Sequence, residues 1–172
     1  MKVQGNVFKF EDNIDTDIII PARYCSSYQK EDLTPHCMEG HPEWTDGSFA
    51  KQVKEGDIIV AGENFGCGSS REVAPLCIKW SGVSLVIANS FARIFYRNSI
   101  NIGLPILVCK EIVEITDHTD EIKANLRTGE ITNVTKNKTF AADKSPLQHK
   151  YRGGSPLNTE NAEVKALISQ LD

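Results

Sequence analysis

The sequence lacks any apolar run of the roughly 18 residues that a membrane-spanning helix needs. Its N-terminal segment, MKVQGNVFKFEDNIDTD, contains no apolar stretch typical of an export signal. Positive charge is also scarce, because 19 Lys and Arg residues against 23 Asp and Glu residues leave a formal net charge of −4. A nucleic-acid surface needs clustered positive charge. We therefore expect a cytoplasmic protein that binds neither membranes nor nucleic acids.

Cysteine is present, but its spacing does not fit a metal or disulfide framework. The five cysteines are an odd number, form no C-x-x-C pair, and lie at positions 25, 37, 67, 77 and 109. This spacing disfavours a zinc or iron–sulfur site built from this chain alone. We expect most of the thiols to be reduced and buried like small apolar side chains.

The sequence has no internal repeat and no long linker, and its length suits one domain covering residues 1–172. In the middle, three short β-branched runs at residues 57–61, 83–88 and 104–109 alternate with two helical patterns. The helical patterns end at Gly82 and Gly103. This order predicts an α/β fold with a parallel β-α-β-α-β core.

The flanking segments have weaker patterns. Residues 3–10 predict a strand, the apolar run at residues 18–22 predicts another, and short helices are expected near residues 30–38 and 48–53. Alternation around a Thr-Gly turn in residues 121–135 predicts a hairpin. An amphipathic helix near the end of the sequence is predicted by the spacing of Val164, Leu167, Ile168 and Leu171.

The densest polar pattern is the stretch GENFGCGSSRE at residues 62–72, between a predicted strand and a predicted helix. Gly66 and Gly68 permit backbone conformations that other residues avoid, and N–H groups at a helix start attract anions. Arg71 offers a planar fork of donors for a carboxylate or a phosphate. The stretch lacks both the third glycine of a dinucleotide fingerprint and the G-K-[ST] of a P-loop, which argues against a nucleotide.

Ser69 has two interpretations on spacing alone. With Glu72 it fits an S-x-x-E capping box, in which the serine caps the helix and the glutamate returns a hydrogen bond. A hydroxyl at the start of a helix also lies where a bound anion would meet it. The pattern leaves both interpretations open.

Three segments of the chain resemble the swivel domain of the aconitase superfamily, in the form of separate small subunits of 3-isopropylmalate dehydratase. These segments are DNIDTDIIIPARY, GDIIVAGENFGCGSSREVAP and SFARIFYRNSINIGLP, and the resemblance covers most of residues 1–110. It implies a three-layer swivelling β/β/α fold around the parallel core. It also implies the small subunit of a heteromeric hydro-lyase that interconverts 2-isopropylmalate and 3-isopropylmalate in leucine biosynthesis.

The resemblance implies a division of labour between two chains. A large subunit, in a heterodimer or heterotetramer, would carry a four-iron, four-sulfur cluster that binds the substrate hydroxyl as a Lewis acid, and this chain would close over a small dicarboxylic hydroxy acid. By the motif match, Ser69 would be the general base, its alkoxide held by helix-start N–H groups and Arg71. Ser70 and Arg71 would hold a substrate carboxylate. Arg23 could contact the other carboxylate or be a surface arginine.

Asp15, Thr16 and Asp17 match the D-T-D element of the same family. They could form a polar turn that leads into the next apolar segment. Alternatively, they could orient Arg71 or the two serines. Cys67 lies inside the glycine-rich stretch, and we assign it no chemical role.

Further polar residues are weaker candidates. Arg93 and Arg97 lie four residues apart on one helical face and could present a positive stripe, although Arg93 could equally satisfy buried carbonyls. Four histidines fit no metal-ligand spacing and are expected to be solvated loop residues. They are His36, His41, His118 and His149.

In small subunits of this type, the residues after P-A-R-Y help to select the side group of the substrate. Here they read Cys25-Ser26-Ser27-Tyr28, with neither the arginine expected of a homoaconitate form nor an apolar residue directly after Tyr24. A small, mildly polar pocket favours isopropylmalate and leaves homoaconitase, citramalate- and dimethylmalate-type subunits as alternatives. From another functional class, a non-catalytic anion-binding regulatory module is the alternative.

Overall fold

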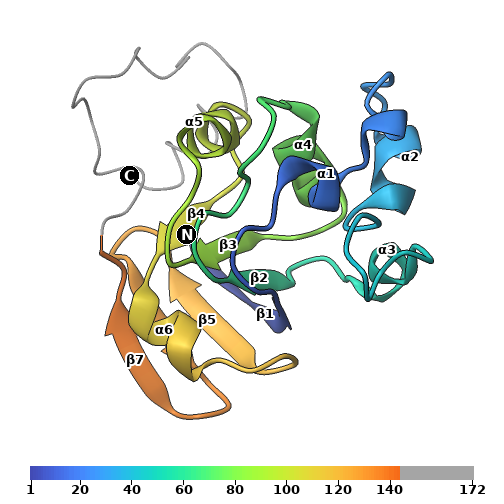
Figure 1. The fold of residues 1–172 in the computed structure, drawn as a ribbon. Helices are drawn as coiled ribbons and strands as arrows, with labels where there is room; N and C mark the ends of the chain where they lie inside the picture. Colours follow the sequence, from blue (N-terminus) through green and yellow to red (C-terminus); the bar gives the residue numbers. More distant parts are fainter. Residues whose placement is uncertain (144–172) are drawn as a thin grey trace.

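The computed structural model describes residues 1–143 of the chain. Within these residues the strands form one seven-stranded sheet, in the order β4-β3-β2-β1-β5-β6-β7 (Figure 1). The predicted amphipathic helix around Val164 lies outside the described residues. The prediction of a single domain over the whole chain therefore stays a prediction.

One half of the sheet is parallel, as the sequence predicts. Its strands are β1 (Lys2–Lys9), β2 (Ile58–Ala61), β3 (Leu85–Ala88) and β4 (Ile106–Val108). Helices α4 (Val73–Trp80) and α5 (Arg93–Asn101) connect β2 to β3 and β3 to β4. Every residue of β2 and β3 is buried, which explains their continuous apolar sequences. The predicted β-α-β-α-β core is confirmed.

The other half of the sheet is antiparallel and begins on the same strand β1. Residues 2–6 of β1 pair with β5, whereas residues 7–9 pair with β2. The predicted hairpin is confirmed as β5 (Glu121–Asn125) and β6 (Glu130–Asn133). The sequence did not predict β7 (Lys138–Ala141) or helix α6 (Lys110–Ile115), because both are short and carry no long periodic pattern.

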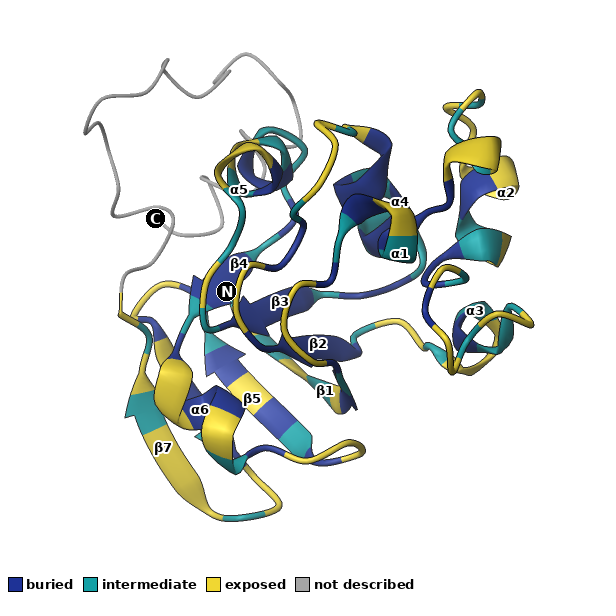
Figure 2. Cartoon of the chain, in the orientation of Figure 1, coloured by how far each residue is buried: buried dark blue, intermediate teal, exposed yellow. Residues whose placement is uncertain are grey.

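Two hydrophobic cores lie on opposite faces of the parallel strands. One core joins these strands to the helices α1 to α5, through residues such as Ile59, Val86 and Ile78. The second core joins them to β5, β6 and α6, through residues such as Ile58 and Ile122. Figure 1 shows α1 to α5 on one side of the parallel strands and the antiparallel strands with α6 on the other, and Figure 2 shows the buried strands between them. The predicted three-layer β/β/α arrangement is confirmed.

The strand predicted at residues 18–22 is wrong. This segment forms the short helix α1 (Thr16–Ile19) and then the 3-10 helix η1 (Ala22–Tyr24). The carboxylate of Asp15 accepts a hydrogen bond of 2.8 Å from the Ile18 amide and so caps α1. The run of three isoleucines is too short to separate a buried helical turn from a strand.

The short helices expected between the first two parallel strands are confirmed. They are α2 (Lys30–Leu33), the 3-10 helix η2 (Thr34–His36) and α3 (Ser48–Gln52). They lie on the same side of the sheet as α4 and contribute to the same core (Figure 1).

Three of the five cysteines, Cys37, Cys77 and Cys109, are buried, and all five are free thiols. Cys25 and Cys67 are partly exposed. Within residues 1–143 no helix is long and apolar enough to cross a membrane.

One histidine prediction is wrong. The ring of His41 is buried, because it lies edge-on against Phe10 while its Nε2 contacts the Glu11 carboxylate at 3.0 Å. His118 is exposed, as expected, and His36 is partly exposed and stacked on Tyr24. His149 lies outside the described residues. His41 belongs to no periodic apolar pattern, so the sequence gives no signal of its burial.

Gly5 lies where β1 changes partners, and we expect its substitution to destabilise the fold. A Cβ at Gly5 would lie 2.1 Å from the Gly56 carbonyl oxygen and 2.9 Å from the Asp57 Cα. Gly5→Ala should therefore lower the free energy of unfolding by about 2 kcal/mol, measured by urea denaturation. Lys2→Ala, on an exposed position of the same strand, is the control. Equal stability of the two variants would contradict this prediction.

Candidate functional site

Two segments far apart in the sequence meet through their backbones at the candidate site. The Gly66 amide donates a hydrogen bond of 2.7 Å to the Ile14 carbonyl, and the Thr16 amide donates one of 2.9 Å to the Cys67 carbonyl. Asp15 and Cys67 form an isolated parallel bridge at this point. The glycine-rich loop after β2 is thus docked on the D-T-D segment after β1.

The two glycines predicted to be special both adopt left-handed backbone conformations. Gly66 has a φ of +78° and Gly68 a φ of +92°. At Gly66 a Cβ would also lie 2.1 Å from the ring of Phe95, which belongs to α5. The loop therefore needs glycine both for its conformation and for its close approach to α5.

Thr16 clamps the backbone of Ser69. Its hydroxyl oxygen accepts a hydrogen bond of 3.2 Å from the Ser69 amide and donates one of 3.3 Å to the Ser69 carbonyl. Thr16 is only 2% exposed, whereas Ser69 and Ser70 are exposed. The clamp holds the main chain of Ser69 and leaves its side chain at the surface.

The capping-box interpretation of Ser69 and Glu72 is wrong. Helix α4 begins at Val73, and Glu72 is its N-cap residue without a side-chain hydrogen bond. The Ser69 carbonyl instead accepts a hydrogen bond of 2.8 Å from the Arg71 amide, which closes a turn before the helix. The expectation that Ser69 lies at the helix start is also wrong, since the amide of Ser69 is already bound to Thr16.

Arg71 is held by the D-T-D segment as well. Its Nη1 donates hydrogen bonds of 2.7 Å to the Asp17 carboxylate and 3.2 Å to the Ile20 carbonyl. The hydrogen bond from Arg71 is the main reason why the pKa of Asp17 is lowered, and the same bond raises the pKa of Arg71. Arg71 is 19% exposed and uses a single nitrogen for both bonds, so other N–H donors of the guanidinium remain. The orienting role suggested for the D-T-D element is thus what the geometry shows.

Arg23 is exposed at the surface and has a defined orientation. Its side chain is 63% exposed, its Nη2 lies 2.8 Å from the Glu39 carboxylate, and its guanidinium carbon lies 4.6 Å from the centre of the Tyr24 ring. Within residues 1–143 no hydrogen bond joins Arg23 to the loop that carries Ser69 and Arg71. The structure therefore brings together Ser69, Ser70 and Arg71, with Arg23 on a neighbouring segment.

Cys25 links the segment that carries Arg23 to the loop that carries Arg71. Its thiol donates to the carbonyls of Ile20 and Pro21, and burial raises its pKa while the nearby Arg71 acts in the opposite direction. The first residue of the predicted specificity loop thus lies beside the guanidinium of Arg71. Glu39, in contrast, was not predicted, because its partner Arg23 is distant in the sequence.

Arg93 and Arg97 are both exposed on α5. The suggestion that Arg93 satisfies buried carbonyls is wrong, since it makes no hydrogen bond with any residue in the described range 1–143. The alternative, a positive stripe facing the cleft, stays a prediction.

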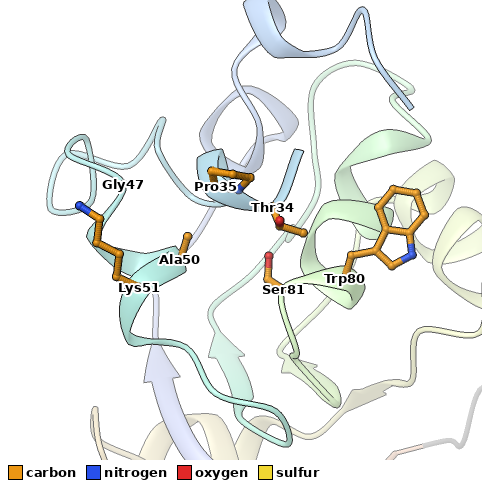
Figure 3. Close-up of a pocket in the computed structure, with 7 residues that line it drawn as sticks. All are labelled: Thr34, Pro35, Gly47, Ala50, Lys51, Trp80 and Ser81. Atoms are coloured by element: carbon orange, nitrogen blue, oxygen red, sulfur yellow. The ribbon is translucent and has the colours of Figure 1, made fainter. Parts of the chain in front are cut away.

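A pocket of about 360 Å³ lies elsewhere on the molecule (Figure 3). It is lined by Thr34, Pro35, Gly47, Ala50, Lys51, Trp80 and Ser81. Trp80 is the last residue of α4, so the pocket lies at the opposite end of this helix from Ser69. None of the predicted site residues lines it. Among residues 1–143 there is also no group of three or more Cys, His, Asp or Glu side chains arranged to hold a metal ion.

Comparisons with known proteins agree with this geometry. The family model described as "Aconitase C-terminal domain" matches residues 6–111. The 3-isopropylmalate dehydratase small subunit of Clostridium botulinum is 55% identical over 146 residues, which cover 85% of this chain and 88% of that protein. The 2,3-dimethylmalate dehydratase small subunit of Eubacterium barkeri is 52% identical over 167 residues, which cover 96% of this chain and 100% of that protein.

A solved structure is also similar. The crystal structure of 3-isopropylmalate dehydratase from Methanocaldococcus jannaschii aligns with a TM-score of 0.77 and 47% identity. The alignment covers 83% of this chain and 82% of the solved chain. The family match at residues 6–111 includes both segments that meet at the site.

We expect the Thr16 hydroxyl to be needed for the order of Ser69. Thr16→Val keeps the shape of the side chain but removes both hydrogen bonds to the Ser69 backbone, which should cost about 1–2 kcal/mol of stability. Amide hydrogen exchange should show faster exchange at Ser69 in this variant. Thr16→Ser keeps the hydroxyl and is the control. If the Ser69 amide were equally protected from exchange in Thr16→Val, the Thr16 hydroxyl would not be what orders Ser69.

Proposed function

Because the chain belongs to the aconitase C-terminal domain family, we propose that it is the small subunit of a hydro-lyase that converts 2-isopropylmalate to 3-isopropylmalate. The conversion proceeds by loss and re-addition of water. The observation that carries the proposal is the docking of the loop on the D-T-D segment. It presents the exposed hydroxyl of Ser69 two residues before Arg71, whose guanidinium is fixed by Asp17.

Ser69 is the proposed general base. Its Oγ removes the proton from the carbon next to a substrate carboxylate during dehydration, and the same hydroxyl returns a proton during rehydration. A serine hydroxyl is a weak base in water, so its anionic form needs nearby positive charge and N–H donors. Arg71 supplies the charge, because a guanidinium is always ionised in proteins, and its ion pair with Asp17 holds it in one orientation.

Two carboxylates of a dicarboxylic substrate need two binding groups. We assign one carboxylate to Ser70 and to the remaining N–H donors of Arg71, since both lie directly after Ser69. We assign the other carboxylate to Arg23, whose exposed guanidinium lies on the segment that follows Ile20, an Arg71 partner. Arginine suits both roles because its planar fork matches a carboxylate.

A second chain is part of the proposal. Ser69 and Ser70 are exposed on this chain, whereas proton removal from carbon requires a site from which bulk water is excluded. A large subunit that covers the loop would exclude the water. We assign the iron–sulfur cluster to that subunit, because the described residues of this chain do not fit one. A cytoplasmic heterodimer or heterotetramer remains our prediction.

A second candidate substrate is 2,3-dimethylmalate. The observation in its favour is the match to the dimethylmalate dehydratase small subunit, which covers 100% of that protein. The loop residues Cys25, Ser26 and Ser27 are small and do not by themselves exclude a substrate with methyl groups.

Reconstitution with the large subunit tests the function. We expect the isolated chain to contain no stoichiometric iron and to have no dehydratase activity. The complex should convert 2-isopropylmalate with a higher kcat/KM than 2,3-dimethylmalate, citramalate or homoaconitate, measured by the absorbance of the carbon–carbon double bond that dehydration forms and hydration removes. A preference for dimethylmalate would select the second candidate. Activity of the isolated chain would overturn the two-subunit proposal.

Ser69→Ala separates the catalytic role from any structural one. Ser69 does not cap α4 and its side chain is exposed. The free energy of unfolding of the variant should therefore lie within about 0.5 kcal/mol of the parent value. Its kcat in the complex should fall by at least about a hundredfold, as expected when a positioned proton-transfer group is lost. Ser70→Ala should instead act mainly on KM. A Ser69→Ala complex with near-normal kcat would remove Ser69 as the base.

A further inference from the structure

Glu39 joins two segments that are well separated in the sequence. One carboxylate oxygen, Oε1, accepts hydrogen bonds of 2.8 Å from Arg23 Nη2 and 2.8 Å from the Tyr24 hydroxyl. The other, Oε2, is paired with Nδ1 of His36. Both oxygens of one carboxylate are therefore occupied by groups from η1 and η2.

Ring stacking reinforces this junction. The Tyr24 and His36 rings are parallel within 4°, with their centres 3.6 Å apart. The Arg23 guanidinium lies over the Tyr24 ring, at 4.6 Å. Only 12% of the Glu39 side chain is exposed. Burial by itself would raise the pKa of Glu39, but hydrogen bonds from His36, Tyr24 and Arg23 lower it overall, so the carboxylate is ionised at neutral pH.

The junction lies beside the proposed substrate site. The segment that carries Arg23 begins at Ile20, whose carbonyl accepts from Arg71, and Cys25 is bonded back to the same carbonyl. The loop of residues 25–29 and helix α2 connect η1 to η2, so the cluster around Glu39 closes this connection at its base.

The geometry points to Glu39 as a positioning residue, which holds Arg23 and the base of the 25–33 segment in the orientation that receives the second substrate carboxylate. This inference rests on the function proposed above. An exposed arginine otherwise populates many rotamers, and the entropy lost when it is ordered weakens binding. Glu39 and Tyr24 restrict these rotamers before the substrate arrives. Only Nη2 of Arg23 is bonded to Glu39, so further N–H donors of the guanidinium remain for the substrate.

The role of Glu39 predicts a defined kinetic effect. Glu39→Gln keeps an acceptor for the Tyr24 hydroxyl but loses the charge that holds Arg23. In the reconstituted complex it should raise KM by about three- to tenfold and leave kcat within about twofold, because ordering of a binding group is lost rather than proton transfer. Glu43→Gln is the control, since Glu43 is exposed in the same region and belongs to no part of the cluster.

A double-mutant comparison tests whether Glu39 acts through Arg23. We expect Arg23→Ala to raise KM at least as much as Glu39→Gln, and the double variant to have the same KM as Arg23→Ala alone. Thermal melting of each complex identifies any variant that is merely misfolded. Nitrogen relaxation of the Arg23 Nε–H group in the complex should show larger motion in Glu39→Gln than in the parent.

Several outcomes would overturn the role of Glu39 while leaving the proposed function intact. These are an active parent complex with an unchanged KM in Glu39→Gln, full additivity of the two substitutions, a fall in kcat at constant KM, or unaltered Arg23 motion. A parent complex without activity on any substituted malate would instead overturn the proposed function and the substrate-binding role of Arg23 with it.

Discussion

The backbone contact between residues 14–16 and residues 66–69 is the interaction on which the site depends. Neither segment belongs to a strand, and each supplies hydrogen-bond partners that the other needs. The left-handed glycines at 66 and 68 would leave the free loop many conformations, and the contact selects one of them. The loop can therefore expose Ser69 and still hold its main chain in a defined position.

The topology of the sheet explains why these two segments meet. Strands β1 and β2 are neighbours and parallel, so the residues that follow them leave the sheet at the same edge. Strand β3 is the next parallel neighbour, and its continuation also contacts the loop, through the bridge between Phe65 and Phe91. In open α/β sheets, ligands bind at the carboxyl ends of the strands for this reason. The three segments that carry the family resemblance are the continuations of β1, β2 and β3.

The charges of the site form a series of fixed pairs. Asp17 holds Arg71, and Glu39 holds Arg23. Each carboxylate is bonded to one nitrogen of its arginine, which orients the guanidinium and leaves further donors. An arginine that is ordered before binding loses less entropy when it meets a carboxylate. In the function proposed above, such arginines would bind a small dianion whose two carboxylates must both be placed for reaction at the two carbons between them.

Predictions failed where a local pattern was ambiguous. The apolar run at residues 18–22 predicts a strand, but capping by Asp15 turns its first residues into a helical turn. The S-x-x-E pattern of Ser69 and Glu72 was compatible with a cap, yet the amide of Ser69 was taken by Thr16. In both cases a hydrogen bond that the pattern does not contain decided the backbone conformation.

The sequence by itself determined the parallel core, its two crossover helices and the identity of the polar loop residues. Apolar runs, helical periodicity and terminal glycines are local signals, and they act over a few residues. Only the tertiary structure decided which side chains hold one another. Thr16 contacts Ser69 across 53 residues of sequence and Asp17 contacts Arg71 across 54. Such partners come together because the sheet brings the strand ends to one edge, and no local pattern in a single sequence encodes that meeting.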